Sequence, residues 1–174
     1  EKYFELAYGQ RQAETGEELG LIYSRINNPN LEIVEDRLAL WEEADCGLTF
    51  SSGMAAIATA LLAYLRPGDV VLPSGPVYGG TEHLIRNVLP AFGVQSVSFE
   101  ADGSIEDIEL AAQRAAALGP VKVVYAETPA NPTNGLVDLE ACARVRDQLA
   151  EQQACAPVFM VDNTFLGPVW QRPL

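Results

Sequence analysis

The sequence predicts an α/β domain with a mostly parallel sheet flanked by helices. Short apolar segments at 70–72, 94–99, 121–126 and 157–162 alternate with amphipathic stretches of helical period. This alternation is typical of parallel strands joined by crossover helices. The 174 residues are 48% hydrophobic, which is enough for one domain with a sizeable core.

The first helices are predicted from their apolar periods and their end signals. Asn30 is the expected N-cap of a helix over residues 31–43, whose apolar side chains share one face. Residues 53–65 form a second, more apolar helix that ends before the breaker Pro67. A third helix is expected over about 81–89.

Two later helices begin at residues that can cap them. Ser104, with Asp107 three residues on, predicts a capping box. Asp138 is the expected cap of the helix over residues 139–152. Each of these helices leads into one of the last two predicted strands.

The N-terminal segment lacks such periods. Residues 1–30 are polar, contain several glycines and show no sustained repeat, which predicts an irregular arm. The expected organisation is therefore an arm over 1–30 that depends on outside contacts for its order, followed by one domain over 31–174.

Composition argues against several function classes. Eleven Lys and Arg against twenty-four Asp and Glu give a net charge of -13, and the basic residues are scattered, which disfavours nucleic acid and anionic membranes. No apolar run has the length of a membrane span, and the N-terminus lacks the apolar core of a signal peptide. We expect a cytoplasmic protein. Cys46, Cys142 and Cys155 show no metal spacing, so no metal is expected and each is interpreted as a small apolar filler.

Candidate ligand loops follow the predicted strands. In open α/β sheets ligands bind beyond the carboxyl ends of strands, and the loops there are 73–81, 127–135 and 162–168. The FSSGM stretch at 50–54 opens a helix whose unpaired N–H groups could bind phosphate, although Ser51 or Ser52 could be a plain N-cap. The one histidine, His83, is interpreted as a surface residue.

Five side chains suggest one ligand. Tyr23 and Arg25, two apart in an extended segment, could bind an anion or form a solvated arm. Tyr78 could lie flat over a planar ligand or be an ordinary half-buried tyrosine. Asn131, between two prolines, offers a fixed amide or a simple turn. Asp162 ends an apolar strand that we expect to be buried, so its carboxylate needs a partner.

Pyridoxal 5'-phosphate would use all of these features. Its phosphate suits the helix start, its ring the aromatic face of Tyr78, and its phenolic oxygen the amide of Asn131. Its protonated pyridine nitrogen would pair with Asp162. The sequence therefore predicts a pyridoxal-phosphate site.

The motifs also resemble a known family. YSRINNPN, SSGMAAI, RPGD, YGGT, ETPANPTN and VDNTFLGPVWQRPL are similar, in order and spacing, to the pyridoxal-phosphate enzymes of cysteine and methionine metabolism. That family includes cystathionine γ-synthase, cystathionine γ-lyase, methionine γ-lyase and O-acetylhomoserine sulfhydrylase. The resemblance implies a fold type I pyridoxal-phosphate transferase-like large domain, an amino-acid substrate and a homotetramer built as a dimer of dimers.

For the phosphate, the resemblance implies two sources of ligands. Gly53 and Met54 match the family's backbone ligands, with Ser52 in the same cradle. Tyr23 and Arg25 match a pair that reaches the phosphate from the neighbouring subunit. Each site would then need two chains.

For the ring, the resemblance implies one residue from each strand-end loop. Tyr78 matches the tyrosine that stacks on the ring and handles protons at the substrate. Asn131 matches the amide beside the ring oxygen, Asp162 the partner of the pyridine nitrogen, and Thr164 the residue beneath the ring. No role is assigned to Glu127.

One departure from the family concerns lysine. The family's Schiff-base lysine follows the QRPL segment, whereas the lysines here are Lys2, in the arm, and Lys122, at the wrong end of a strand. The family's C-terminal domain has no counterpart either. We expect these residues to be a portion of a longer enzyme and to be inactive alone.

The expected activity is γ-elimination or γ-replacement on a sulfur-containing or O-acylated homoserine-type amino acid. Methionine γ-lyase or β-lyase specificity is an alternative, although Gly80 stands where methionine γ-lyases commonly have cysteine. A non-catalytic binding or assembly module is another alternative. An unrelated nucleotide-binding domain is disfavoured because the glycine fingerprint is missing.

Overall fold

The computed structural model describes residues 2–17 and 20–174. The chain forms two compact units, a first that ends at Thr49 and includes Leu174, and a second over Phe50–Pro173. The second unit contains the sheet and the candidate site, and each unit is described by itself.

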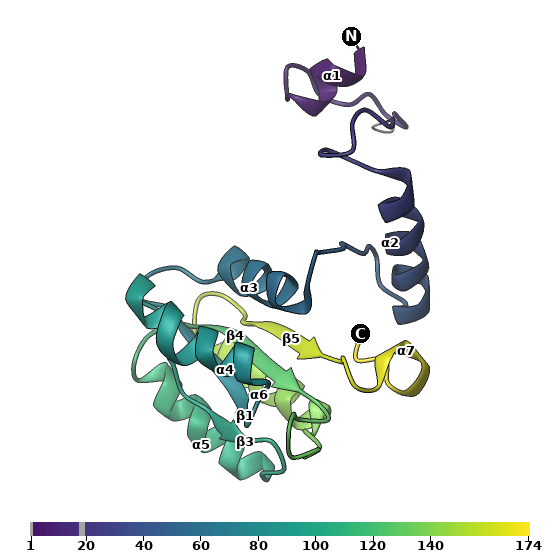
Figure 1. The fold of residues 1–174 in the computed structure, drawn as a ribbon. Coiled ribbons are helices and arrows are strands. Elements are labelled where there is room, and N and C mark those ends of the chain that lie inside the picture. Colours follow the sequence, from purple (N-terminus) through teal and green to yellow (C-terminus); the bar gives the residue numbers. More distant parts are fainter. Residues whose placement is uncertain (1, 18–19) are drawn as a thin grey trace. The chain divides into compact units, whose positions relative to one another are not determined.

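The second unit is built on a parallel sheet (Figure 1). Its strands are β1 (Val70–Gly75), β2 (Gln95–Ser96), β3 (Phe99–Glu100), β4 (Val121–Glu127) and β5 (Val158–Asp162). The order is β2-β1-β4-β5, with β3 also pairing with β1. Every strand pair in the described residues is parallel. The predicted fold class is therefore confirmed.

Helices cover both faces of this sheet. On one face α3 (Gly53–Tyr64) and α4 (Gly79–His83) pack with the following turns, and on the other lie α5 (Ile105–Ala116) and α6 (Leu139–Gln152). The predicted caps of three of these helices are present. They are Ser52 for α3, the Ser104–Asp107 capping box for α5, and Asp138 for α6.

The strands alternate their side chains between the two cores. Val124 and Ala126 of β4 pack in the cluster with α5 and α6, whereas Val123 and Tyr125 pack in the cluster with α3. In the ladder between β4 and β5, Tyr125 is opposite Met160. By the same period of two, Glu127 and Asp162 lie on the α3 face, at the carboxyl ends of their strands.

The strand predicted over 94–99 is divided into β2 and β3. Both pair with β1, at Val70–Val71 and at Ser74–Gly75. The carbonyls of Val71 and Gly75 accept N–H bonds from Val97 and Ala101, so alternate residues of β1 face this edge. Pro73 lies between them and has no N–H to donate, which interrupts the ladder.

The helix predicted over about 81–89 starts two residues earlier and changes form. After α4 it continues as a π-helical turn, Leu84–Val88, and then as a 3-10 turn, Leu89–Phe92. Pro90 cannot donate a hydrogen bond to the preceding turn, which is consistent with the change of geometry.

Strand β5 is only partly buried, so the prediction that this strand is buried is wrong. It is the last strand in the sheet order, and so it pairs with a neighbour on one side. Asp162, its final residue, is likewise partly exposed. A short helix α7 (Gly167–Trp170) follows.

In its described residues, the first unit contains two helices, α1 (Lys2–Ala7) and α2 (Pro29–Glu42). The arm is therefore not irregular throughout. The N-cap of α2 is Asn28 rather than Asn30, because the Asn28 side chain accepts the Asn30 N–H at 2.9 Å. The predicted apolar face of α2 is exposed within this chain; it consists of Ile33, Val34, Leu38 and Trp41.

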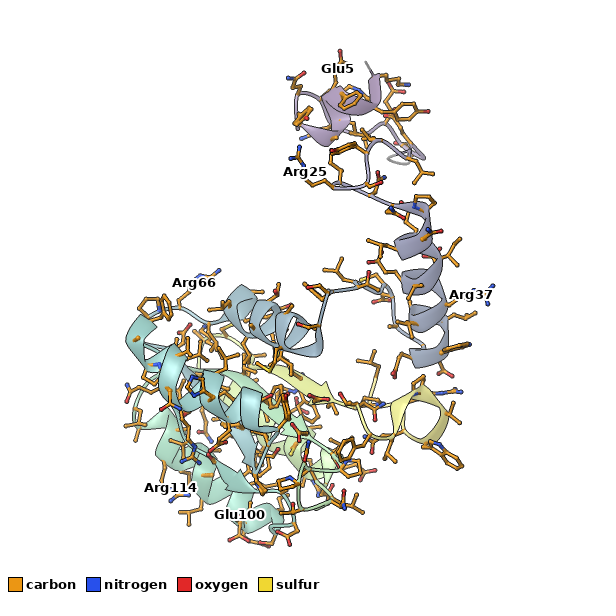
Figure 2. The ribbon with its side chains drawn as sticks, viewed as in Figure 1. Glu5, Arg25, Arg37, Arg66, Glu100 and Arg114 are labelled. Carbon is orange, nitrogen blue, oxygen red and sulfur yellow. The ribbon has the colours of Figure 1, made fainter. Side chains whose placement is uncertain are left out.

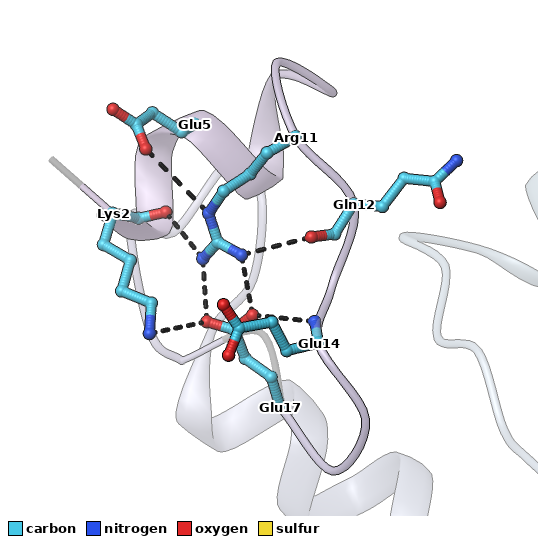
Figure 3. Close-up of polar contacts among 6 residues, drawn as sticks. All are labelled: Lys2, Glu5, Arg11, Gln12, Glu14 and Glu17. Carbon is cyan, nitrogen blue, oxygen red and sulfur yellow. Dashed lines mark hydrogen bonds and ion pairs between the residues drawn. The ribbon is translucent and has the colours of Figure 1, made fainter.

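A carboxylate organises the start of the first unit (Figure 3). Both Glu17 carboxylate oxygens accept N–H bonds from the Arg11 guanidinium, each at 2.7 Å. The Glu17 carboxylate also accepts the Glu14 N–H at 3.0 Å, and the Lys2 ammonium lies 3.3 Å away. These contacts lower the pKa of Glu17 to about 2, the hydrogen bond from Arg11 being the largest cause.

Two smaller expectations have mixed outcomes. Cys142 is a buried filler, but Cys46 and Cys155 are exposed, so that interpretation is wrong for them. His83 is on the surface, as predicted, and Lys122 lies near the start of β4, far along the strand from Glu127. Among the helices of the described residues, none is long and apolar enough to cross a membrane.

Candidate active site

A cavity of about 360 Å³ opens where β4 and β5 end and α3 begins. Its size is within the range of cofactor pockets. Seven residues that the sequence predicted for the cofactor line it, namely Ser52, Gly53, Met54, Tyr78, Asn131, Asp162 and Thr164. Glu127, which had no predicted role, lines it too.

The start of α3 forms one wall of the cavity. The Ser52 hydroxyl accepts the Ala55 N–H at 3.1 Å, so Ser52 is the N-cap. Ser52, Gly53 and Met54 line the cavity as well. The cap interpretation and the phosphate interpretation are therefore compatible, because the first N–H groups of a helix favour an anion.

Asp162 is held by three neutral donors. Its Oδ1 accepts the Thr164 N–H at 3.1 Å and the Thr164 hydroxyl at 2.5 Å. Its Oδ2 accepts the Tyr125 hydroxyl at 3.1 Å. None of these donors carries a charge that would neutralise the carboxylate, so the protein itself gives Asp162 hydrogen bonds but no cationic partner.

Tyr125 was missed by the sequence reasoning. Its side chain is 3% exposed, and burial, followed by the Asp162 charge, raises its pKa, so the phenol remains a hydrogen-bond donor at neutral pH. It directly precedes Ala126 in an apolar strand, and a tyrosine in such a strand is normally interpreted as a core residue. The available signal was its spacing of two from Glu127, which places both on one face.

Glu127 connects two of the loops. Its carboxylate accepts the Tyr78 N–H at 3.0 and 2.9 Å, one distance to each oxygen, and the Asn131 N–H at 2.7 Å. Burial raises the pKa of Glu127, and the Asp162 charge acts in the same direction, whereas the two N–H donors lower it. Tyr78 is 47% exposed, which leaves its side chain available to a ligand.

Gly80 lies where a larger residue would disturb this wall. A Cβ at Gly80 would approach Met54 Sδ and Tyr78 Cε1 to 2.7 Å each. Both contacts are to side-chain atoms, so a substitution would displace the Tyr78 ring and the Met54 thioether. Glycine at this position thus permits the present arrangement of the two side chains.

Tyr23 and Arg25 are in the first unit. They lie in a turn closed by the Ile26 N–H donating to the Tyr23 carbonyl at 2.7 Å, so the predicted extended segment is wrong. The two side chains are nevertheless neighbours, because the Arg25 guanidinium carbon is 5.5 Å from the centre of the Tyr23 ring. Both side chains are exposed.

The cavity suits a flat, anionic heteroaromatic ligand. A helix start favours the anionic group, an exposed aromatic ring favours a planar group, and an ionised, oriented carboxylate favours a protonated ring nitrogen. No cluster of three or more metal-ligating side chains occurs among the described residues. The fold and site thus define an α/β domain with a cofactor pocket at the carboxyl ends of its strands.

Comparison with known proteins identifies the family. The model of the Cys/Met metabolism PLP-dependent enzyme family matches residues 3–174. This chain belongs to that family, and its cofactor, pyridoxal 5'-phosphate, agrees with the prediction from the sequence.

Individual relatives have different activities. The chain is 37% identical to an L-methionine gamma-lyase of Fusobacterium nucleatum, over 91% of this chain and 37% of the relative. It is also 37% identical to a cystathionine gamma-synthase/O-acetylhomoserine (thiol)-lyase of Bacillus subtilis, over 99% of this chain and 42% of the relative.

A solved structure shows the same fold with the cofactor. It is described as an O-acetylhomoserine (thiol)-lyase from Campylobacter jejuni and contains pyridoxyl-lysine monophosphate. The TM-score is 0.76 at 31% identity, over 90% of this chain and 36% of that chain. The present chain thus spans well under half the length of these relatives.

Proposed function

We propose that the intact protein catalyses pyridoxal-phosphate-dependent γ-elimination or γ-replacement on a sulfur-containing or O-acylated homoserine-type amino acid. The observation that carries the proposal is Asp162, a carboxylate fixed by neutral donors at the edge of a cofactor-sized cavity. Membership of the family supports the cofactor chemistry.

When bound, pyridoxal phosphate supplies an electron sink for the carbanion that forms when the substrate loses its α-proton. Asp162 would keep the ring nitrogen protonated, because the negative charge of its carboxylate favours the protonated form. Thr164 and Tyr125 keep the carboxylate in place for this task. The N–H groups at the start of α3 would hold the phosphate, near Ser52, Gly53 and Met54.

Two further side chains act on the reacting end of the cavity. Tyr78 would place its ring against the cofactor ring, and its phenol would donate a proton near the leaving group. Asn131 would donate a hydrogen bond from its side-chain NH₂ to the ring oxygen. We assign Tyr78 and Asp162 as catalytic residues.

Substrate choice is the finer part of the proposal. Methionine γ-lyase and β-lyase specificities are the alternatives, and the relatives' names include both a methionine gamma-lyase and a cystathionine beta-lyase. Gly80 weighs mildly against methionine γ-lyase, because methionine γ-lyases commonly have a cysteine at this position.

We also propose that the site is shared between subunits of a homo-oligomer, a dimer of dimers located in the cytoplasm. Tyr23 and Arg25 of one chain would contact the phosphate bound by another. Their exposure and their adjacency support this, since a phenol and a guanidinium side by side suit a phosphate.

The test uses the full-length protein and the substitution Asp162→Asn. This variant keeps the shape of the side chain but not its charge, so kcat for γ-elimination should fall by roughly 100-fold or more. Wild-type protein should develop a visible absorption band with pyridoxal phosphate, which borohydride bleaches while fixing the cofactor to one lysine.

The matched control is Asp102→Asn, an exposed aspartate in a turn of the second unit. It should leave kcat unchanged. An Asp162→Asn enzyme with normal turnover would show that the ring nitrogen does not need this carboxylate, and the assignment would be abandoned.

A further inference from the structure

Glu127 lies at the cavity but has no part in the proposed chemistry. It is the last residue of β4, it is 4% exposed, and its carboxylate lies among backbone N–H groups. A buried carboxylate is costly unless its oxygens are hydrogen-bonded. The positions of its hydrogen-bond donors therefore indicate the role of this residue.

Those partners come from two separate loops. Tyr78 follows β1 and is the residue before α4, whereas Asn131 lies in the loop after β4. The Tyr78 N–H reaches both carboxylate oxygens, at 3.0 and 2.9 Å, and the Asn131 N–H reaches Oε1 at 2.7 Å. One side chain thus joins the backbones of two residues that face the same cavity.

The base of this connection is itself fixed. The Glu127 N–H donates to the hydroxyl of Ser74, a residue of β1 that is 1% exposed, at 3.0 Å. In the ladder, Glu127 is opposite Asp162. The backbone of Glu127 is therefore held by the sheet, and its carboxylate is held by the two loops.

We propose that Glu127 is a positioning residue that clamps the Tyr78 and Asn131 loops over the cofactor cavity, so that the ring of Tyr78 and the amide of Asn131 keep their mutual position. It acts through those residues and does not touch reacting atoms. The inference deepens the proposed function and rests on it for the nature of the ligand, but the clamp itself consists of contacts within this chain.

The competing explanation is that Glu127 supplies a negative charge or acts as a base in the reaction. Two substitutions separate the explanations. Glu127→Gln keeps the length of the side chain and one acceptor oxygen, Oε1, which is the atom that both N–H groups approach. Glu127→Asp keeps the charge but withdraws the carboxylate by one methylene, out of reach of the loops.

The experiment measures hydrogen exchange in the full-length protein without cofactor, in peptides that contain Tyr78 or Asn131. A clamp predicts faster exchange of both segments by about tenfold or more in Glu127→Asp and by less in Glu127→Gln. With pyridoxal phosphate bound, the visible circular dichroism of the cofactor should weaken in the same order. Thermal unfolding of each variant verifies that it is folded.

The matched control is Glu100→Gln. Glu100 is an exposed glutamate at the end of β3 and points outward from the second unit (Figure 2). It should leave exchange in both segments and the dichroism at wild-type values.

Two results would overturn the clamp. One is wild-type exchange at Tyr78 and Asn131 in both Glu127 variants, and the other is normal dichroism in Glu127→Asp with loss in Glu127→Gln, which would indicate a charge role. Exchange is measured without cofactor. A wild-type protein that fails to bind pyridoxal phosphate would therefore refute the proposed function while the exchange result still decides on the clamp.

Discussion

Asp162 shows how a carboxylate can be fixed without being neutralised. A lysine or arginine in place of its donors would form an ion pair and compete with a cationic ligand. Instead the two oxygens accept bonds from the Tyr125 hydroxyl and from Thr164, all neutral groups. The carboxylate thus keeps its charge and its orientation for a ligand in the cavity.

Tyr125 can be tested by removing only its hydroxyl. Tyr125→Phe keeps the ring in the core but leaves Oδ2 of Asp162 without its donor. We expect the full-length protein to lose roughly 1 kcal/mol in free energy of unfolding, measured by denaturant titration, since water can replace part of the bond. The affinity for pyridoxal phosphate should fall about tenfold because Asp162 is less well oriented.

Tyr64→Phe is the appropriate control for Tyr125→Phe. Tyr64 ends α3 and is half exposed, so loss of its hydroxyl should change neither quantity. Unchanged cofactor affinity in Tyr125→Phe would mean that Thr164 alone orients Asp162.

The residues of the site were predictable to different degrees. Asp162 was identifiable because a carboxylate at the end of an apolar segment needs a partner, and Tyr78 and Asn131 because loop composition marked them. The hydrogen bonds that connect these residues were not predictable. Tyr125 and Glu127 act across strand neighbours and loops, and those contacts depend on a register that one sequence does not contain.

At the scale of elements, local sequence signals predicted where helices start better than where a strand is interrupted. The caps Ser104 and Asp138 were found because capping is a contact between residues three apart. The break between β2 and β3 was not, because its cause, Pro73, is in a different strand. The partial exposure of β5 likewise follows from its place in the sheet order.

The turn from Arg11 to Glu17 is an element with a predicted dependence on pH (Figure 3). The pKa of Glu17 is lowered from 4.5 to about 2, so its ionised form is favoured by the folded turn. A lowered pKa contributes stability that is present above the unfolded value and is lost as the pH falls toward the folded one. The turn should therefore loosen between about pH 4.5 and pH 2.

The measurement is a carbon NMR titration of the Glu17 carboxyl group, with an expected midpoint near pH 2. Arg11→Leu removes the two 2.7 Å bonds and should move the midpoint toward 4.5. Arg37→Leu, at an exposed arginine of α2, should not move it (Figure 2). A wild-type midpoint near 4.5 would show that the Arg11 contact does not persist in solution.

For the whole molecule, the two units differ in how much of their apolar surface this chain covers. Helices α5 and α6 bury their apolar faces against the sheet, as the spacing predicted. None of the residues of α2 is buried, although its apolar residues share a face. A sequence pattern predicts that such a face exists but not which surface covers it, and a neighbouring subunit is the partner that our proposal implies.

Sharing of the site between chains can be tested by complementation of two inactive full-length variants. Arg25→Ala would impair what a chain gives its neighbour, and Asp162→Ala would impair the cavity of its own chain. When both are refolded together, each mixed pair should contain one intact site, because the Asp162→Ala chain still provides Arg25. Random pairing then restores about one quarter of wild-type activity and cofactor content.

The control for the mixing procedure is to refold Arg37→Ala, which should be active alone, together with Asp162→Ala. About half of the sites should then be active. If the Arg25→Ala and Asp162→Ala mixture is no more active than its separate components, Arg25 serves its own chain or none, and the shared site is refuted.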